Sequence, residues 1–257
     1  MKKYKKLLSF GCSFTQGGGL NSGKFHKWLE FGNILPVDTG FDDFQGLLPE
    51  HLAYSAYHSF PGYLSRKLDC ELENLSLSGA SNDYIFKKAY DEISKLDNPQ
   101  EVLVTIQSTF FNRLYLRIPG NEIQINFNNL DTAKSYFPYS SPYNDIGYNF
   151  YKTYLQHFYD EDHEYEKLRM KVDTISAYCE KIGVDSVFLF YTDAGKNPIQ
   201  HPRRVDLIKY KNLGEMNADG VWNITNFTEG RFKDCHFSPV GNAAIANLIY
   251  KHVEEHF

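Results

Sequence analysis

Three runs of apolar residues, separated by stretches with helical periodicity, constrain the fold of this chain more than any other feature. They lie at the end of residues 4–10 and across residues 101–106 and 184–191, and none of them alternates between apolar and polar positions. Such continuous runs are typical of strands in a parallel sheet that is covered on both faces. A second strand is expected at residues 71–77, and a weaker one at residues 220–224. The pattern predicts an α/β protein, a three-layer α/β/α sandwich around a parallel sheet of about five strands.

Helix start and stop signals lie between the expected strands. Ser59-Phe60-Pro61 is typical of a helix start, and Ser81 or Asn82 can cap the next helix. A longer helical pattern stops at Gly183, and the last helix is expected to begin after Ser238-Pro239. Strand and helix therefore alternate along the chain. Right-handed crossovers then bring the loops that follow the strands to one edge of the sheet.

Two long segments interrupt this alternation and are interpreted as insertions into one domain that spans residues 1–257. The first insertion covers about residues 17–58. The second covers about residues 108–160 and contains an expected hairpin of residues 114–118 and 122–127. Because both insertions follow strands at the same edge, we expect them to build a pocket over the site, with a satellite core or a subunit interface as the alternative. The aromatic residues expected in this pocket are Tyr136, Phe137, Tyr139, Tyr143 and Tyr148.

Composition and charge exclude several functions. A formal net charge of −5 argues against non-specific nucleic-acid binding, which needs clustered positive charge. The four cysteines form no C-x-x-C pair, so they are interpreted as reduced thiols and not as a disulfide frame or a metal site. No apolar run approaches the length of a membrane span, and no signal peptide is evident, so a cytoplasmic location is expected. No metal or organic cofactor is implied, and the oligomeric state stays open.

Polar residues at the ends of the expected strands form a candidate site. Ser13 lies just past the first strand in Gly11-Cys12-Ser13-Phe14, and Gly79 lies in the turn after the second. Asp234 and His236 directly precede the last helix. A histidine held by an aspartate is the base that a serine nucleophile requires. The non-functional interpretations are that Ser13 is a turn serine, Gly79 a turn glycine and Asp234 a solvated loop acid.

These segments resemble the blocks of the SGNH (GDSL-type) hydrolase family. Gly11-Cys12-Ser13-Phe14 resembles the first block, with Cys12 in place of the usual Asp, and the Asn74–Gly79 segment resembles the second. Asp234-Cys235-His236 resembles the last block, although the family usually has three residues from Asp to His. The subgroup most similar to this chain is formed by bacterial and phage proteins that begin with Gly-Cys-Ser-Phe-Thr. The resemblance implies a flavodoxin-like sheet and assigns Ser13, His236 and Asp234 to a catalytic triad.

The resemblance also implies an oxyanion hole, in which this chain departs from the family. The N–H groups of Ser13 and Gly79 are the expected backbone donors. The third block normally supplies an Asn, but this chain has Gln107-Ser108-Thr109 at that point. The amides of Asn82 and Gln107 are the best placed substitutes, and Thr109 and Arg113 are assigned to substrate binding.

The leading hypothesis is a serine esterase that removes acetyl or another short acyl group from a sugar or a small ester. An O-acyltransferase with the same site is an alternative, as is a non-catalytic binding or structural module that retains the fold. A phosphate-binding loop at residues 18–24 is a weak third possibility, because Phe25 stands where a metal-binding Ser or Thr belongs. The acyl group and its acceptor are not identified by the sequence.

Overall fold

The protein is described by a computed structural model that covers residues 2–20, 49–118, 121–125, 144–190, 201–206 and 236–257. Its centre is a parallel sheet of five strands in the order β2-β1-β3-β6-β7. The strands are β1 (Lys6–Phe10), β2 (Glu71–Asn74), β3 (Val102–Gln107), β6 (Asp185–Phe190) and β7 (Arg204–Asp206). The predicted α/β class with a parallel sheet of about five strands is confirmed. The strand order is that of a flavodoxin-like sheet.

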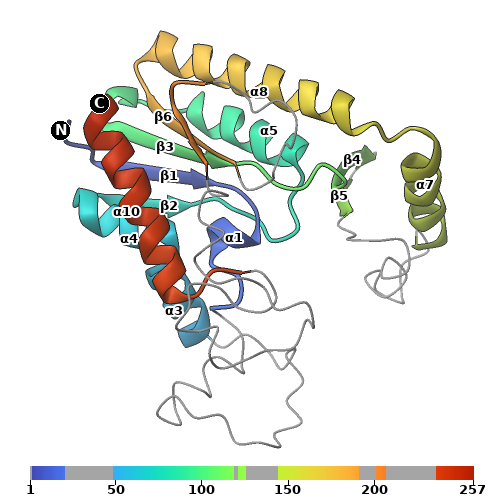
Figure 1. The fold of residues 1–257 in the computed structure, drawn as a ribbon, viewed down its shortest axis with the longest axis horizontal. Helices are drawn as coiled ribbons and strands as arrows, with labels where there is room; N and C mark the ends of the chain where they lie inside the picture. Colours follow the sequence, from blue (N-terminus) through green and yellow to red (C-terminus); the bar gives the residue numbers. More distant parts are fainter. Residues whose placement is uncertain (1, 21–48, 119–120, 126–143, 191–200, 207–235) are drawn as a thin grey trace, which may run out of the picture.

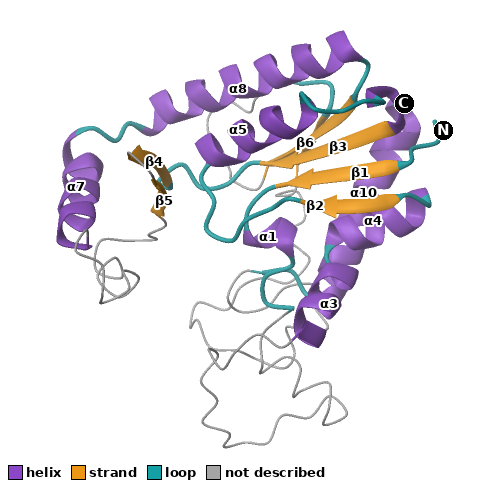
Figure 2. Cartoon of the chain, turned by 180° about the vertical axis from the view of Figure 1, so that it is seen from behind, coloured by secondary structure: helices purple, strands orange, loops and turns teal. Residues whose placement is uncertain are grey.

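Helices cover both faces of the sheet (Figures 1 and 2). On one face α4 (Phe60–Leu68) packs against α10 (Pro239–His256), with α3 (Pro49–His58) beside them. On the other face α5 (Asn82–Ile93) packs against α8 (Glu161–Ile182). This arrangement follows from right-handed crossovers, since the β1–β2 connection and the later connections run in opposite directions across the sheet.

Local signals in the sequence explain where these helices begin and end. The hydroxyls of Ser59, Ser81 and Ser238 accept hydrogen bonds from the backbone N–H groups three residues further on, so each serine is an N-cap. Gly183 ends α8 in the left-handed conformation, with φ of 78°, which a glycine adopts without a Cβ clash. All four boundaries match the sequence prediction.

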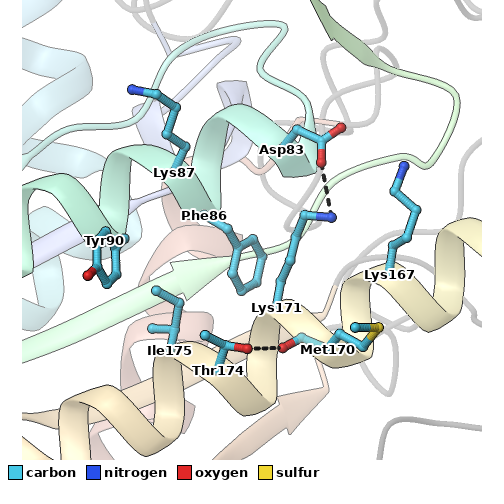
Figure 3. A pocket seen from close by; sticks show the side chains of 9 residues that line it. All are labelled: Asp83, Phe86, Lys87, Tyr90, Lys167, Met170, Lys171, Thr174 and Ile175. Atoms are coloured by element: carbon cyan, nitrogen blue, oxygen red, sulfur yellow. Dashed lines mark hydrogen bonds and ion pairs between the residues drawn. The ribbon is translucent and has the colours of Figure 1, made fainter.

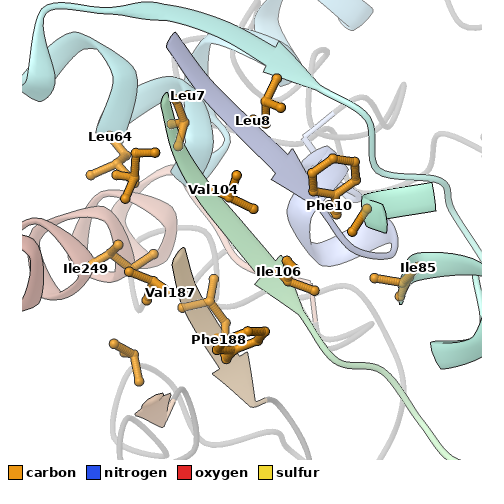
Figure 4. Close-up of a cluster of buried hydrophobic side chains, with 14 of the residues drawn as sticks. Leu7, Leu8, Phe10, Leu64, Ile85, Val104, Ile106, Val187, Phe188 and Ile249 are labelled. Carbon is orange, nitrogen blue, oxygen red and sulfur yellow. The ribbon is translucent and has the colours of Figure 1, made fainter. Parts of the chain in front are cut away.

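The core forms where strand side chains meet these helices (Figure 4). The strands β1, β3 and β6 contribute buried side chains that are each at most 1% exposed, among them Leu7, Phe10, Val104, Ile106 and Phe188. Burying one such side chain contributes roughly 1.5–3 kcal/mol, so the sheet provides a rigid frame for the loops at its edge.

The remaining elements add to, confirm or differ from the sequence prediction. A four-residue helix, α1 (Ser13–Gln16), follows β1, and α7 (Asn144–His157) lies within the aromatic-rich insertion. The predicted hairpin is confirmed as β4 (Leu114–Ile118) and β5 (Asn121–Ile125), and a short 3-10 helix, η1 (Pro99–Glu101), precedes β3. The fifth strand is β7, while residues 220–224 lie outside the described residues. In the part of the chain that the structure covers, no helix is long and apolar enough to cross a membrane.

The topology defines where a site can form. The chain leaves β1 for β2 on one side, and it leaves β3 for β6 on the other, so the direction of the connections reverses between β1 and β3. In open α/β sheets the crevice outside the carboxyl ends of the strands at such a point is where ligands bind. The loops after β1 and β3 contain Ser13 and Thr109 respectively.

Candidate active site

Ser13 is the first residue of α1, immediately after the carboxyl end of β1. The chain makes this tight entry at Gly11, where a Cβ would stand 2.0 Å from Thr15 Oγ1, so no side chain fits there. Cys12 is extended and fully buried, and its carbonyl accepts hydrogen bonds from the Thr15 and Gln16 N–H groups. Ser13 thus begins a short helix at the end of β1, and it keeps 8% of its surface exposed.

His236 lies next to Ser13, although 223 positions separate the two in sequence. The distance from His236 Nε2 to Ser13 Oγ is 2.8 Å, which is a hydrogen bond. The imidazole packs on the Phe14 ring, with ring centroids 4.9 Å apart. The Phe237 ring also packs on Phe14, with a centroid distance of 5.5 Å. Asp234, the predicted third member of the triad, lies outside the described residues. The structure thus brings together the predicted nucleophile and the predicted base.

Gly18 fixes the place of the imidazole and was not assigned such a role from the sequence. Its N–H donates a hydrogen bond of 2.6 Å to the Ser13 carbonyl. A Cβ on Gly18 would stand 2.5 Å from His236 Cδ2, closer than atoms of this kind approach one another. The absence of a side chain at this position therefore makes room for the imidazole of His236.

Asn242 holds the segment that contains His236 and was also missed by sequence reasoning. Its side chain is 1% exposed and lies on the inner side of α10. Oδ1 accepts from the Phe60 N–H at 2.8 Å, while Nδ2 donates to the carbonyls of Phe237 and Ser238 at 2.9 and 3.1 Å. One buried amide thus joins the start of α4 to the residues that follow His236.

Gly79 lies in the turn between β2 and α5 and has a φ of 78°, a conformation that favours glycine. The turn is fastened to the loop after β1, because the Leu77 N–H donates to the Gly11 carbonyl and Asn74 Nδ2 donates to the Thr15 carbonyl. Within the described residues, the N–H groups of Ser13 and Gly79 have no hydrogen-bond acceptor. Two backbone donors are therefore uncommitted at this edge.

The two amides predicted near the oxyanion position make different contacts. Asn82 binds both backbone groups of Thr109: Oδ1 accepts from the N–H at 2.8 Å, and Nδ2 donates to the carbonyl at 3.1 Å. Gln107 is fully buried below α1, where its Oε1 accepts a hydrogen bond from the Thr15 hydroxyl. Its Nε2 is buried and has no hydrogen-bond partner in the part of the chain that the structure describes. Asn82 thus ties the start of α5 to the loop after β3.

Arg113, predicted to contact substrate, is buried in the same loop, next to Thr109. Its Nη1 donates to Thr109 Oγ1 at 2.8 Å and to the Ala80 carbonyl at 3.3 Å. The guanidinium carbon stands 5.0 Å from the centre of the Phe110 ring. Phe110 in turn contacts Phe14, with centroids 6.5 Å apart. Ring contacts therefore link Arg113, through Phe110, to Phe14, the residue that follows Ser13.

Most of the glycine-rich stretch and of the predicted aromatic pocket lies outside the described residues. Gly18, the start of the glycine-rich stretch, contacts His236, and residues 21–48 of the first insertion lie outside the described part. The predicted pocket aromatics at positions 136, 137, 139 and 143 lie outside it as well, as does the side chain of Tyr148. Among the described residues no group of three or more His, Cys, Asp or Glu could hold a metal ion. Cys12, Cys70 and Cys179 are free thiols.

A hollow of about 430 Å³ lies between α5 and α8, on the face of the sheet away from α10 (Figure 3). It is lined by the apolar parts of Phe86, Tyr90 and Met170 and by lysines. The lysines are in ion pairs; Lys171, for example, pairs with Asp83 at 3.0 Å. This pair joins the first turn of α5 to α8 and so supports the helix start that contains Asn82.

Three solved structures are similar in fold to this chain. One, from Desulfitobacterium hafniense DCB-2, is assigned to the G-D-S-L family of lipolytic proteins; it has a TM-score of 0.43 and 13% identity, covering 96% of this chain and 99% of that one. Another is a carbohydrate esterase whose active site displays divergent catalytic and non-catalytic binding functions, with a TM-score of 0.44, 9% identity and coverage of 99% and 70%. The third, from Parabacteroides merdae ATCC 43184, is assigned as a GDSL-like lipase. It has a TM-score of 0.40 and 12% identity, and the match covers 99% of this chain and 97% of that one.

No protein-family profile matches the chain, and no curated protein matches it either. The likeness to the three solved structures concerns the fold alone. The chemical case for the site therefore lies in the Ser13–His236 pair and in the residues that hold it.

Proposed function

We propose that the protein is a serine ester hydrolase of the SGNH type, with Ser13 as nucleophile and His236 as general base. The observation that supports this most is the 2.8 Å separation of Ser13 Oγ and His236 Nε2. Nucleophile and base within hydrogen-bond reach at the carboxyl edge of an α/β sheet are what acyl transfer through a serine requires. Asp234 is proposed to orient the imidazole and to stabilise its cation.

In the first half of the reaction Ser13 Oγ attacks the carbonyl carbon of the ester while its proton passes to His236 Nε2. The resulting tetrahedral intermediate has a negatively charged oxygen. When the intermediate collapses, the bond to the leaving alcohol breaks, and the alcohol oxygen takes the proton from the His236 imidazolium. An acyl group remains on Ser13 Oγ.

In the second half His236 Nε2 takes a proton from water, and the hydroxide oxygen adds to the acyl carbon. The bond to Ser13 Oγ then breaks, the serine oxygen recovers the proton, and the acid leaves. If a sugar hydroxyl takes the place of water, the same steps transfer the acyl group and the protein is an O-acyltransferase. Hydrolysis of an acetyl or another short acyl ester is the proposed activity.

The oxyanion is proposed to lie against the uncommitted N–H groups of Ser13 and Gly79. Donors of this kind stabilise charge that develops only in the transition state, and the loss of one typically lowers the rate on the order of 10²–10³-fold. The amides of Asn82 and Gln107 are proposed to support this oxyanion hole. Asn82 binds both backbone groups of Thr109, and Gln107 accepts from the Thr15 hydroxyl of α1.

Covalent labelling tests this function directly. A fluorophosphonate probe should label Ser13, as located by peptide mass mapping, and a 4-nitrophenyl ester series from acetate to octanoate should be hydrolysed. Ser13→Ala should abolish both, whereas Ser94→Ala, an exposed serine at the end of α5, should change neither. A folded protein that neither reacts with the probe nor hydrolyses any ester would instead be a non-catalytic binding module.

A further inference from the structure

Arg113 is a buried cation whose charge the described residues do not neutralise. The residue is 7% exposed, so most of its hydration shell is lost on folding. No ion pair formed within the described part of the chain includes Arg113. The partners that it has, the Thr109 hydroxyl, the Ala80 carbonyl and the Phe110 ring, are all uncharged.

An unpaired buried charge is costly, which is why buried arginines are normally found with a carboxylate or a phosphate. Hydroxyl and carbonyl dipoles offset only part of the lost hydration. Two other arginines show the contrast: Arg203 lies 3.5 Å from a Glu180 carboxylate oxygen, and Arg66 is an exposed residue that stacks on Tyr57. Arg113 therefore lies in an environment that an anion would complete.

The hydrogen bonds of Arg113 leave one particular edge of the guanidinium without partners. The hydrogen bonds to Thr109 and Ala80 both use Nη1. Nε is buried, and within the described residues neither Nε nor Nη2 has a hydrogen-bond partner. Nε and Nη2 together form the side of the guanidinium that binds two oxygens of one carboxylate or phosphate in parallel. The vacant edge thus has the geometry of a bidentate anion site.

A series of ring contacts links Arg113 to the residues beside Ser13. The Phe110 ring lies between Arg113 and Phe14, and Phe14 lies against the imidazole of His236. The backbone next to Arg113 is held from both sides, because Asn82 binds Thr109 and the buried Tyr151 hydroxyl donates to the Asn112 carbonyl at 2.6 Å. An anion on Arg113 would therefore occupy a fixed position relative to the nucleophile.

We propose that Arg113 binds an anionic group of the ester substrate, a carboxylate or a phosphate, and so selects acidic esters over neutral ones. The proposal rests on the proposed esterase function for its link to catalysis, whereas the anion site itself is testable without turnover. Thr109 positions the guanidinium by accepting from Nη1.

Binding is measured first, in the Ser13→Ala variant, by calorimetric titration with succinate and, separately, with inorganic phosphate. We expect one of these anions to bind, and the tighter one identifies the group that the substrate contains. Adding Arg113→Met should weaken that binding by about 10²-fold, in the range found when one member of a buried charge pair is truncated. Adding Arg66→Met, which removes the same charge from the surface, should leave binding unchanged. No binding of either anion, or equal binding after Arg113→Met, would overturn the proposal.

Turnover supplies the second test. Wild-type protein should hydrolyse 4-nitrophenyl hydrogen succinate with a higher kcat/KM than 4-nitrophenyl butyrate, which has the same chain length without the charge. Arg113→Met should remove this preference through KM, and Arg113→Lys, which keeps the charge but not the fork, should retain part of it. Hydrolysis of both esters without preference rejects the anion site and leaves the esterase intact. Anion binding without hydrolysis of any ester rejects the esterase and leaves the site.

Arg113→Met removes a buried side chain, so its fold is checked by circular dichroism. If it does not fold, Arg113→Lys decides the question. In the Ser13→Ala background, Arg113→Lys should bind the anion about tenfold more weakly, because a lysine cannot form two parallel hydrogen bonds. An unchanged affinity in that variant would overturn the bidentate site.

Discussion

Gly18 packs directly against the imidazole of His236: a Cβ on Gly18 would stand 2.6 Å from Nε2, the atom that is hydrogen-bonded to Ser13 Oγ. The nearest atoms belong to the far end of a side chain, which can rotate away, and the backbone contact to the Ser13 carbonyl at 3.0 Å is less severe. A methyl group at this position would therefore displace the base and leave the fold largely intact.

Gly18→Ala should lower kcat by about 10²-fold, since a displacement of about 1 Å of a catalytic group costs about that much. Thermal unfolding should change little. Gly183→Ala is the matched control: its φ of 78° makes the substitution cost about 1 kcal/mol of stability, but it lies at the end of α8 and should leave kcat unchanged. Full activity of Gly18→Ala would mean that the imidazole does not work from this position.

Asn82→Ala and Gln107→Ala should each lower kcat by about 10²-fold with little change in KM. The two amides are proposed to support oxyanion binding, which strengthens mainly in the transition state. For Asn82 the structure gives a route, since its amide fixes both backbone groups of Thr109. Gln100→Ala, which removes an exposed amide, is the control. If both variants keep full kcat, the backbone N–H groups of Ser13 and Gly79 suffice.

Much of this fold could be predicted from the sequence because its signals are local. Continuous apolar runs identified β1, β3 and β6, and the cap serines and Gly183 identified helix boundaries. The strand β7 has three residues, too few to show a period, and the many aromatic residues around α7 conceal its helical spacing. Elements without a local signal were therefore the ones missed.

In the site, the sequence favoured residues with evident chemistry and missed those that act by position. Ser13 and His236 were singled out because a hydroxyl and an imidazole suit acyl transfer. Gly18 and Asn242 have no such signature, and their roles arise only where distant segments meet: Gly18 against His236, Asn242 against Phe60. The signal that could have found Asn242 is a single polar residue on the apolar stripe of the last helix, among Ile245, Ala246 and Ile249.

Asn242→Leu should destabilise the protein by about 3 kcal/mol. The substitution leaves the Phe60 N–H and the Phe237 carbonyl buried without their side-chain partner, and each unsatisfied group costs about 1–3 kcal/mol. The variant should also lose activity at temperatures where it is still folded, since the segment next to His236 is released. Asn242→Asp keeps the acceptor for Phe60 but turns a carboxyl oxygen toward the Phe237 and Ser238 carbonyls, so it should also be less stable than the wild type. Equal denaturation midpoints for Asn242→Leu and wild type would contradict this role.

The stability of the protein should fall as the pH drops below about 7, and His201 should account for part of the loss. Burial lowers the pKa of His201 below its usual value, with nearby Asp173 and Arg203 acting in opposite directions. The hydrogen bonds agree with a neutral ring, since Nδ1 accepts from the Arg203 N–H at 3.2 Å and Nε2 lies 3.0 Å from Ser176 Oγ. A proton on Nδ1 would remove the first bond and place a charge beside the β6–β7 edge of the sheet.

The sign of the effect follows from the lowered pKa of His201. The unfolded chain binds a proton near pH 6.5, whereas the folded protein does so only at lower pH, so the free energy of unfolding decreases as the pH falls through this window. His201→Gln keeps a donor for Ser176 but does not titrate. It should therefore reduce the decrease in denaturation midpoint between about pH 7.5 and about pH 5, a range that brackets the ordinary histidine pKa of about 6.5. His163→Gln, at an exposed position on α8, should leave the pH dependence as it is in wild type. A His201→Gln variant with an unaltered slope would show that the ring titrates equally in both states.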